Sequence, residues 1–361
     1  MAERPRAAAR AADPDARAFE VSAPVRADLA GGTLDLWPLN CLHPGSITVN
    51  VALRRGIRLR VTAGAAPRGR IRHLAPGRAP VELSRRDARR RLVAAVGFHF
   101  VPDGGFAVEV LEQPPLGSGL GGSSALAVAL ARGCLALGGR RLATGRIVPV
   151  LRDLEARVLG VPTGVQDYLP ALLGGALAIH LEPGGERVER LPLDASWIAA
   201  RLLVVYSGVA HASGMVNWDV YRSRVDGERR VARALDAIAA AARACRAALL
   251  AGNERAVGAA IAAEWRARRA LAPAVSTPAV DAILAAGLAA GADAAKACGA
   301  GGGGSVLFWT RPDRRVAVRA AVLAAAPRRA AEVGGGPASA GARVTRTGSR
   351  RHGAAGAGET R

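Results

Sequence analysis

The chain has 361 residues, half of them hydrophobic, and a formal net charge of +21. This length allows two domains with cores of their own, whereas no apolar run reaches the roughly 18 to 20 residues of a membrane-spanning helix. The positive charge comes from arginines spread along the chain rather than from one basic stripe, so composition favours nonspecific attraction to polyanions over specific nucleic-acid binding.

Both ends of the chain, residues 1–18 and 328–361, are predicted to be disordered, because they are rich in alanine, glycine and arginine and offer little to bury. Between them the hydrophobic pattern alternates between strand and helix periods. A Pro-Gly-Gly-Glu turn marks a domain boundary and predicts domains at 19–185 and 186–327. Strands are expected at 20–27, 57–61, 106–111, 175–181 and 202–206, and helices at 123–137, 150–159, 226–251 and 254–271.

The four cysteines are scattered and form no Cys-x-x-Cys pair. The sequence therefore indicates neither a disulfide framework nor a zinc site. The first residues include arginines but no apolar core of a secretory signal, so the cytoplasm is the expected location.

A glycine-rich segment at 114–126, PPLGSGLGGSSAL, precedes the first predicted helix. Glycine lets the backbone approach a ligand closely. A helix that begins near Ser123 would direct its free N–H groups and the positive end of its dipole at this segment. Together these features predict an anion site, with phosphate as the expected ligand. A glycine turn before a core helix is the structural alternative.

Other phosphate-binding signatures fit this segment less well. Gly117, Gly119 and Gly122 match the dinucleotide pattern G-x-G-x-x-G. That pattern needs a carboxylate about 20 residues later to bind a ribose, and the chain has none there. A Gly-Lys-Ser/Thr sequence is absent, as are the H-R-D and D-F-G signatures of protein kinases.

Three further segments carry residues suited to phosphoryl transfer. The first, APVRADLAGGTLDLWP at 23–38, places Arg26, Asp28 and Asp35 around a Gly-Gly turn. The second, GVPTGVQDYLPALLGG at 160–175, contains Asp167, and the third, KACGAGGGGSVLFW at 296–309, is another glycine-rich loop before a strand. Its first residue is the only lysine of the chain, which indicates a need for a compact ammonium group there.

With these four segments in this order, the chain resembles the GHMP kinases, named for galactokinase, homoserine kinase, mevalonate kinase and phosphomevalonate kinase. The resemblance covers about 23–309 and is strongest to the sugar-kinase branch, especially the heptose 7-phosphate kinases. It implies a two-domain α+β fold, with an N-terminal domain like domain 2 of ribosomal protein S5 and a C-terminal ferredoxin-like domain. It also implies an active site between the domains.

The resemblance implies that ATP and Mg²⁺ are bound at the first glycine-rich loop. Ser123 and Glu155 match the family's metal-binding serine and glutamate, and Mg²⁺ usually takes one or two protein oxygens besides phosphate and water. An exposed helix charge is the alternative for Glu155. The ATP-binding set is Pro115, Gly117, Ser118, Gly119, Leu120, Gly121, Gly122, Ser123 and Ser124.

Two residues are expected to act in catalysis. Asp167 matches the family's base, which accepts the proton of the attacking hydroxyl. The alternative is that it caps a helix that begins at Tyr168. Arg26 matches the arginine of the first motif, and it would either stabilise charge on the transferring phosphoryl group or act through Asp167.

Asp35 matches an acidic residue that binds sugar hydroxyls, because a carboxylate accepts two hydrogen bonds in fixed geometry. The chain reads Gly-Gly-Thr-Leu-Asp where relatives read Gly-Gly-x-Thr-Asp or similar, which alters the expected sugar contacts. Lys296 is expected to contact a phosphate of ATP or of the substrate. The substrate-binding set is Asp35, Gly32, Thr33, Asp167, Lys296, Gly301 and Gly302.

The sequence thus predicts a kinase that transfers the γ-phosphate of ATP to a hydroxyl of a sugar or sugar phosphate, of heptose 7-phosphate, galactose or fucose type. A monomer or homodimer without nucleic-acid or membrane partners is expected. A mevalonate- or homoserine-type kinase is one alternative. A catalytically silent sensor of sugar and ATP on the same fold is another.

Overall fold

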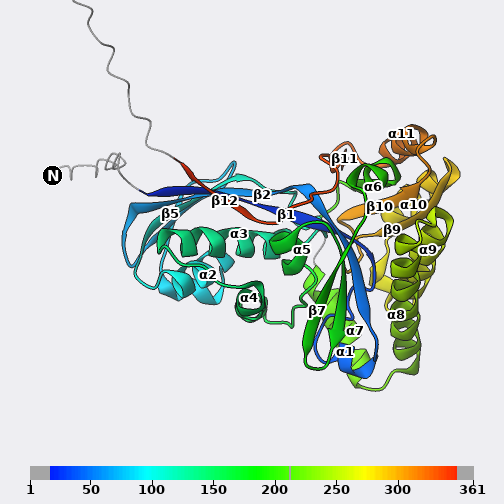
Figure 1. Cartoon of the computed structure of the whole chain (residues 1–361), viewed down its shortest axis with the longest axis horizontal. Helices are drawn as coiled ribbons and strands as arrows, with labels where there is room; N and C mark the ends of the chain where they lie inside the picture. Colours follow the sequence, from blue (N-terminus) through cyan, green and yellow to red (C-terminus); the bar gives the residue numbers. More distant parts are fainter. Residues whose placement is uncertain (1–16, 211–212, 348–361) are drawn as a thin grey trace, which may run out of the picture.

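The computed structural model describes residues 17–210 and 213–347, which form two domains, each with a sheet and flanking helices (Figure 1). This arrangement confirms the expected two-domain α+β fold. Within the described part of the chain, no helix combines the length and the apolar character needed to cross a membrane.

The first domain contains an eight-stranded sheet in the order β12-β1-β2-β5-β3-β4, with β6 on β2 and β7 on β6. The 22-residue β2 pairs with β1, β5 and β6 along different parts of its length. The elements are β1 (Ala18–Ala30), α1 (Leu39–Leu42), β2 (Ile47–Arg68), β3 (Ile71–Leu74), β4 (Val81–Leu83), η1 (Arg85–Arg89), α2 (Leu92–Phe100), β5 (Gly104–Glu112), α3 (Gly122–Leu137), α4 (Thr144–Leu159), α5 (Tyr168–Leu173), β6 (Ala176–Glu182) and β7 (Gly185–Leu191).

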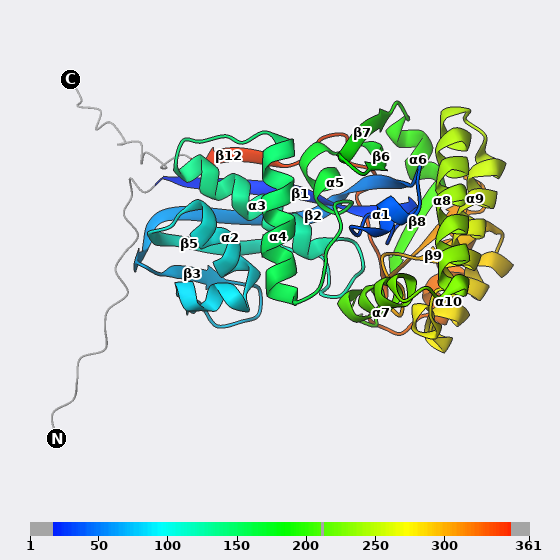
Figure 2. The ribbon, with the colours of Figure 1, turned by 90° about the horizontal axis from the view of Figure 1, so that it is seen from below.

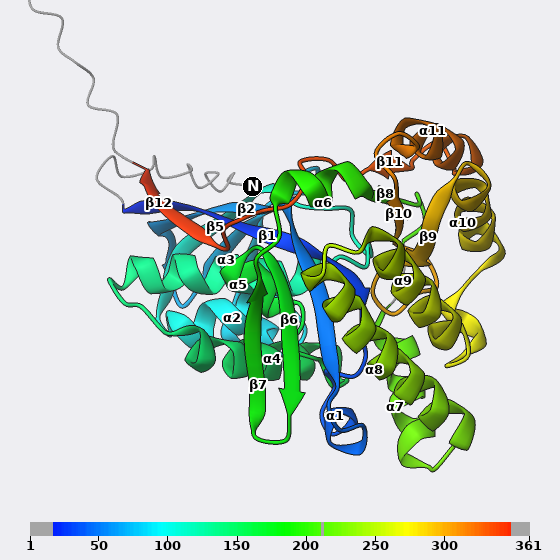
Figure 3. The same ribbon diagram turned by 45° about the vertical axis from the view of Figure 1, so that its right-hand side comes forward.

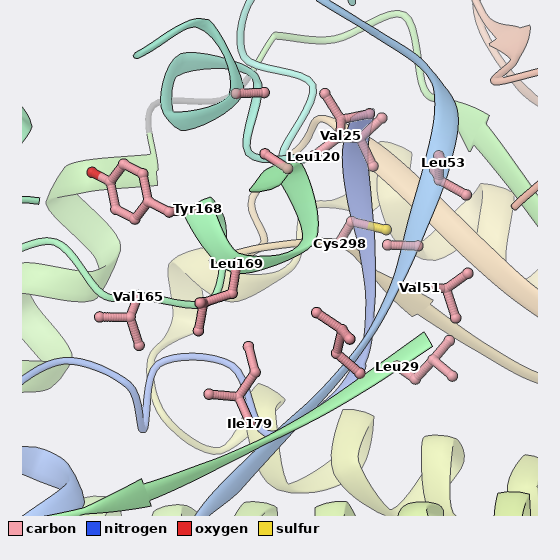
Figure 4. Packing of buried hydrophobic residues seen from close by; sticks show 14 of the residues in the cluster. Val25, Leu29, Val51, Leu53, Leu120, Val165, Tyr168, Leu169, Ile179 and Cys298 are labelled. Atoms are coloured by element: carbon pink, nitrogen blue, oxygen red, sulfur yellow. The ribbon is translucent and has the colours of Figure 1, made fainter. Parts of the chain in front are cut away.

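Helices α2, α3, α4 and α5 lie on one face of this sheet (Figures 1 and 2). Helix α3 is apolar on nearly every side because it lies between the sheet and the other helices. Its Gly133 permits the close approach, since a Cβ there would lie 2.8 Å from a Val61 methyl. The apolar packing continues toward the second domain, where Cys298 is buried close to Val25 and Leu120 (Figure 4).

The second domain contains an antiparallel sheet in the order β11-β8-β10-β9. Numbered within the domain, this order is 4-1-3-2, which with the intervening helices gives the βαββαβ pattern of a ferredoxin-like fold. Its elements are α6 (Ala195–Arg201), β8 (Leu202–Tyr206), α7 (Ser213–Val225), α8 (Arg229–Leu250), α9 (Glu254–Arg269), η2 (Pro273–Val275), α10 (Pro278–Ala289), β9 (Ala292–Ala297), β10 (Ser305–Thr310), α11 (Arg315–Ala325) and β11 (Ala331–Glu332). The chain then returns to the first sheet as β12 (Arg343–Thr347).

Two features differ from the sequence prediction of the domain limits. The strand β7 pairs with β6, so the first sheet extends past the predicted boundary to Leu191. Residues 331–347, expected within a disordered tail, form β11 and β12, and β12 pairs with β1 (Figure 3). The pairing uses backbone groups of an edge strand, which is why a composition poor in large apolar residues did not reveal it. Residues 1–16 and 348–361 lie outside the described part.

The segment between β11 and β12 returns from the second domain to the first. Its backbone forms hydrogen bonds with α5 and with the residue before β6. Ala342 N–H donates to Ala171 O at 2.8 Å, and Gly175 N–H donates to Ala338 O at 2.6 Å. At Gly341 the two backbones meet, because a Cβ there would lie 2.0 Å from Leu172 O. The returning segment therefore packs against the helix that follows Asp167.

Changing Gly341 to alanine is expected to lower the free energy of unfolding by about 1–3 kcal/mol, because the added methyl group overpacks this contact. Gly334→Ala is the matched control, since a Cβ there meets nothing within 4 Å; its effect should stay within about 0.5 kcal/mol. Urea unfolding of both variants measures the difference, and equal stabilities would show that the returning segment is loosely held.

Candidate active site

A cavity of about 380 Å³ lies where the first domain meets the second. Its lining comes from the first glycine-rich loop, the start of α3, the end of α4 and the segment before α5. The second domain contributes Asn217 of α7, together with Gly299 and Ala300 of the second glycine-rich loop. The two loops predicted from sequence therefore meet at one cavity.

The two glycine-rich loops touch through their backbones. Ser305 N–H donates to Ser118 O at 2.7 Å. Gly119 and Gly299 both have positive φ, and a Cβ at Gly119 would lie 2.7 Å from Cys298 O. These glycines are required because side chains would hold the loops apart.

Helix α3 points its N-terminus into the cavity. Its first backbone bond runs from Ala125 N–H to Gly121 O, and Gly122, Ser123 and Ser124 line the cavity. Gly121 has φ +73, and a Cβ there would lie 3.0 Å from the carboxyl carbon of Asp167. Free N–H groups and the helix dipole thus create an anion site directly beside this carboxylate.

Asp167 forms an ion pair with Arg26 rather than a helix cap. Its Oδ1 accepts from Arg26 Nε at 2.7 Å, and the side chain makes no cap bond to the start of α5. Arg26 also donates to Gly119 O at 2.6 Å. Burial would lower the pKa of Arg26, but the carboxylates of Asp167 and Asp28 outweigh it and raise the pKa, so the arginine stays charged.

Glu155 is buried, which excludes the alternative interpretation of this residue as an exposed charge on a helix. Its Oε2 accepts from Ser124 Oγ at 2.8 Å and from the hydroxyl of Tyr168. Burial raises the pKa of Glu155 above its ordinary value, because the charged form loses water without gaining a cation. Together with the exposed Ser123 hydroxyl, this carboxylate is a hard-oxygen donor set that fits Mg²⁺.

Asp35 is buried at the cavity wall, where its Oδ2 accepts from Gln166 N–H at 3.0 Å. Burial raises the pKa of Asp35 to about 6. Thr33, two residues earlier, has φ +77, an uncommon value for a β-branched residue. Its Oγ1 donates to Asn217 Oδ1 at 3.2 Å and accepts from Arg268 at 3.1 Å, so both domains hold this turn.

Behind the cavity, the two domains share a buried cluster of charges. Lys296 Nζ lies 3.1 Å from Asp28 Oδ2 and 3.0 Å from Glu264 Oε2. Glu264 also accepts from Arg268, which donates to Gly32 O at 2.9 Å. Burial would raise the pKa of Asp28, but Lys296 and the neighbouring arginines hold it below its ordinary value.

Most predicted residues lie at the cavity, and some lie elsewhere. Lys296 is fully buried between carboxylates, and Gly301 and Gly302 pack against Val275. Gly32 and Leu120 do not line the cavity themselves but contact residues that do: Gly32 lies against Gln166, and Leu120 O accepts from Arg26 N–H. The lining includes Arg26, Thr33, Asp35, Pro115, Gly117, Ser118, Gly119, Gly121, Gly122, Ser123, Ser124, Glu155 and Asp167.

Sequence reasoning missed Gln166, Asn217, Glu264 and Arg268. Gln166 stands directly before Asp167, so its position beside the candidate base was an available signal. The other three belong to helices of the second domain, where nothing in the local pattern distinguishes them from ordinary polar residues.

Comparisons with known proteins agree with this arrangement. The model of the GHMP kinases N terminal domain matches residues 86–175, and that of the GHMP kinases C terminal region matches residues 245–328. D-glycero-alpha-D-manno-heptose 7-phosphate kinase of Campylobacter jejuni is 25% identical over 58% of this chain and 62% of its own length. The bifunctional fucokinase/GDP-fucose pyrophosphorylase of Arabidopsis thaliana is 28% identical over 59% of this chain. The match spans only 21% of that protein.

Solved structures share the fold. Lactococcus lactis galactokinase, complexed with galactose, superposes with a TM-score of 0.73 at 15% identity, over 91% of this chain and 95% of its own. A D-glycero-D-manno-heptose 1-phosphate kinase from Bacteroides thetaiotaomicron gives 0.70 at 19% identity, over 91% and 99%. The expected two-domain fold of the family is thereby confirmed.

Proposed function

We propose that this chain, which belongs to the GHMP kinase family, transfers the γ-phosphoryl group of ATP to a hydroxyl of a sugar. The observation that carries the proposal is the contact between the anion site and the carboxylate. At Gly121 the α3 terminus passes against Asp167 so closely that a Cβ would touch its carboxyl group. A phosphate at the helix and a hydroxyl at Asp167 would therefore be neighbours.

Each residue has its own role in phosphoryl transfer, in which catalysis is mainly positioning and charge stabilisation. The N–H groups of Gly122, Ser123 and Ser124 bind phosphate oxygens. Asp167 accepts the proton of the attacking hydroxyl as the new P–O bond forms. Arg26 fixes the orientation of Asp167 and supplies positive charge beside the reacting groups.

Ser123 and Glu155 are the proposed ligands of Mg²⁺. When bound, the metal ion neutralises charge on the phosphate oxygens. Ser124 and Tyr168 hydrogen-bond Glu155 and so hold its carboxylate toward the start of α3. The cytoplasm is the proposed location of this reaction.

Replacing Glu155 with glutamine is expected to raise the Mg²⁺ concentration for half-maximal activity by about tenfold or more, because a neutral amide is a weaker ligand. Asp153→Asn is the matched control, since it removes an exposed carboxylate from the same helix. Mg²⁺ titrations of nucleotide binding and of turnover measure the effect, and identical curves for both variants would remove Glu155 as a ligand.

Acidification should weaken the binding of sugar through Asp35. The carboxylate accepts sugar hydroxyls only when ionised, and its pKa is raised by burial to about 6. We therefore expect kcat/KM for the sugar to fall about tenfold per pH unit below 6. The pH profile of Asp35→Asn should lose this inflection; an unchanged inflection in that variant would assign the titration to another group.

An ADP-release assay across hexoses, heptoses, fucose and arabinose tests the proposed function. A kinase gives sugar-dependent ADP release, whereas a sensor of sugar and ATP binds both without turnover. Mevalonate and homoserine are included as acceptors, and turnover of either one alone would replace the sugar-kinase proposal by another branch of the family.

A further inference from the structure

The cavity has two sides with different chemistry. Backbone N–H groups at the start of α3 form the side suited to phosphates of ATP. The other side is lined by Asp35, Thr33, Gln166 and Asn217, whose side chains carry a carboxylate, a hydroxyl and two amides. Carboxylates, hydroxyls and amides are the partners that bind sugar hydroxyls.

Three cations of the described residues lie near this acceptor side, and all three are already paired. Arg26, the one cationic side chain among the described lining residues, bonds Asp167 and Gly119 O. Lys296 lies between two buried carboxylates, 3.1 and 3.0 Å from its Nζ. Arg268 is bound to Glu264 and to the Gly32–Thr33 turn. Arg26 can turn toward a ligand only by leaving Asp167. Lys296 and Arg268 can do so only by breaking ion pairs with the fully buried Asp28 and Glu264, which is costly.

On the basis of the proposed function, we propose that the acceptor is an uncharged sugar and not a sugar phosphate. A bound phosphate group is favoured by charge-assisted hydrogen bonds from arginine or lysine, and the described cations beside this side already bond other groups. On this side it would instead face the carboxylates of Asp35 and Asp167. Because burial raises the pKa of Asp35 only to about 6, its carboxylate is charged at neutral pH and repels a second anion.

This assignment separates the chain from the heptose 7-phosphate kinase that it resembles in sequence. The ion pairs of Lys296 are consistent with this assignment. The single lysine, expected at a phosphate, neutralises Asp28 and Glu264 instead, so the cluster stabilises the domain contact and adds no phosphate site on the acceptor side.

The test compares matched pairs of acceptors with the full-length protein: galactose with galactose 6-phosphate, mannose with mannose 6-phosphate, and D-glycero-D-manno-heptose with its 7-phosphate. We expect kcat/KM to be at least 100-fold higher for the uncharged member of the best pair. Asn217→Arg adds a cation to the acceptor side and should reduce this ratio at least tenfold. Asn217→Gln, which keeps the charge, should not reduce it.

Calorimetric measurements of the binding of the same pairs distinguish failure of the uncharged-acceptor proposal from failure of the kinase proposal. A preference for the phosphorylated member, in turnover or in binding, overturns the uncharged-acceptor proposal and leaves the kinase proposal standing. Preferential binding of uncharged sugars without ADP release refutes the kinase function and supports the acceptor class. Equal binding of both members, or of neither, contradicts the assignment of this side of the cavity. Thermal unfolding and ATP binding verify that each Asn217 variant is folded.

Discussion

Changing Asp167 to asparagine should lower kcat by about 10²–10⁴-fold, the usual contribution of a positioned general base. The amide keeps an oxygen that can accept from Arg26 Nε, now 2.7 Å from Asp167 Oδ1. The shape of the site and its contact with Gly121 are therefore retained. What is lost is the ability to take a proton from the attacking hydroxyl.

Affinity for ATP separates this effect from a general disturbance of the site. The phosphates are expected to bind backbone N–H groups at the start of α3, so the dissociation constant of ATP should change less than threefold. Asp219→Asn, at an exposed carboxylate on α7, is the control for substitution alone. Single-turnover and equilibrium-binding measurements together make the test, and a kcat within threefold of the unsubstituted protein would refute the base assignment.

The residues that local patterns identified are those whose role depends on their immediate neighbours. Glycines before a helix predict an anion site from backbone geometry alone, and the segment around Gly121 indeed forms the start of α3 beside the cavity. The family pattern likewise led to Asp167. The sequence favoured this role but left a helix cap open as the alternative, because the position of Arg26, 141 residues away, decides where the carboxylate points.

The remaining features arise from contacts between distant segments, which local patterns do not encode. Arg268 donates to Gly32 O across 236 residues, and Thr33 reaches Asn217 across 184. The positive φ of Thr33 has no local signal, because threonine rarely adopts it. Strand β12 was missed for a related reason: its stability comes from pairing with β1 through the backbone, and residues 343–347 are mostly exposed.

Replacing Lys296 with methionine is expected to lower the free energy of unfolding by about 3–5 kcal/mol, the range found when one partner of a buried ion pair is removed. Asp28 and Glu264 are both fully buried, and each would lose the ammonium group that lies about 3 Å away. Urea unfolding gives the free energy directly, and the fitted slope verifies that the transition remains two-state.

Combining Lys296→Met with Asp28→Asn tests whether charge balance is the cause. The double variant removes one charge of each sign, and the asparagine can still accept from Gly299 N–H, now 2.9 Å from Asp28 Oδ1. It should therefore recover part of the stability lost in the single variant, which urea unfolding of both variants measures. A phosphate-binding lysine predicts a different pattern. The single variant would then keep its stability and show a higher KM for ATP or for the acceptor, and the asparagine would restore nothing. A structural role changes the free energy of unfolding, whereas a substrate-binding role changes KM. Unfolding and kinetic measurements of the same two variants therefore decide between the two roles of the Lys296 ammonium group.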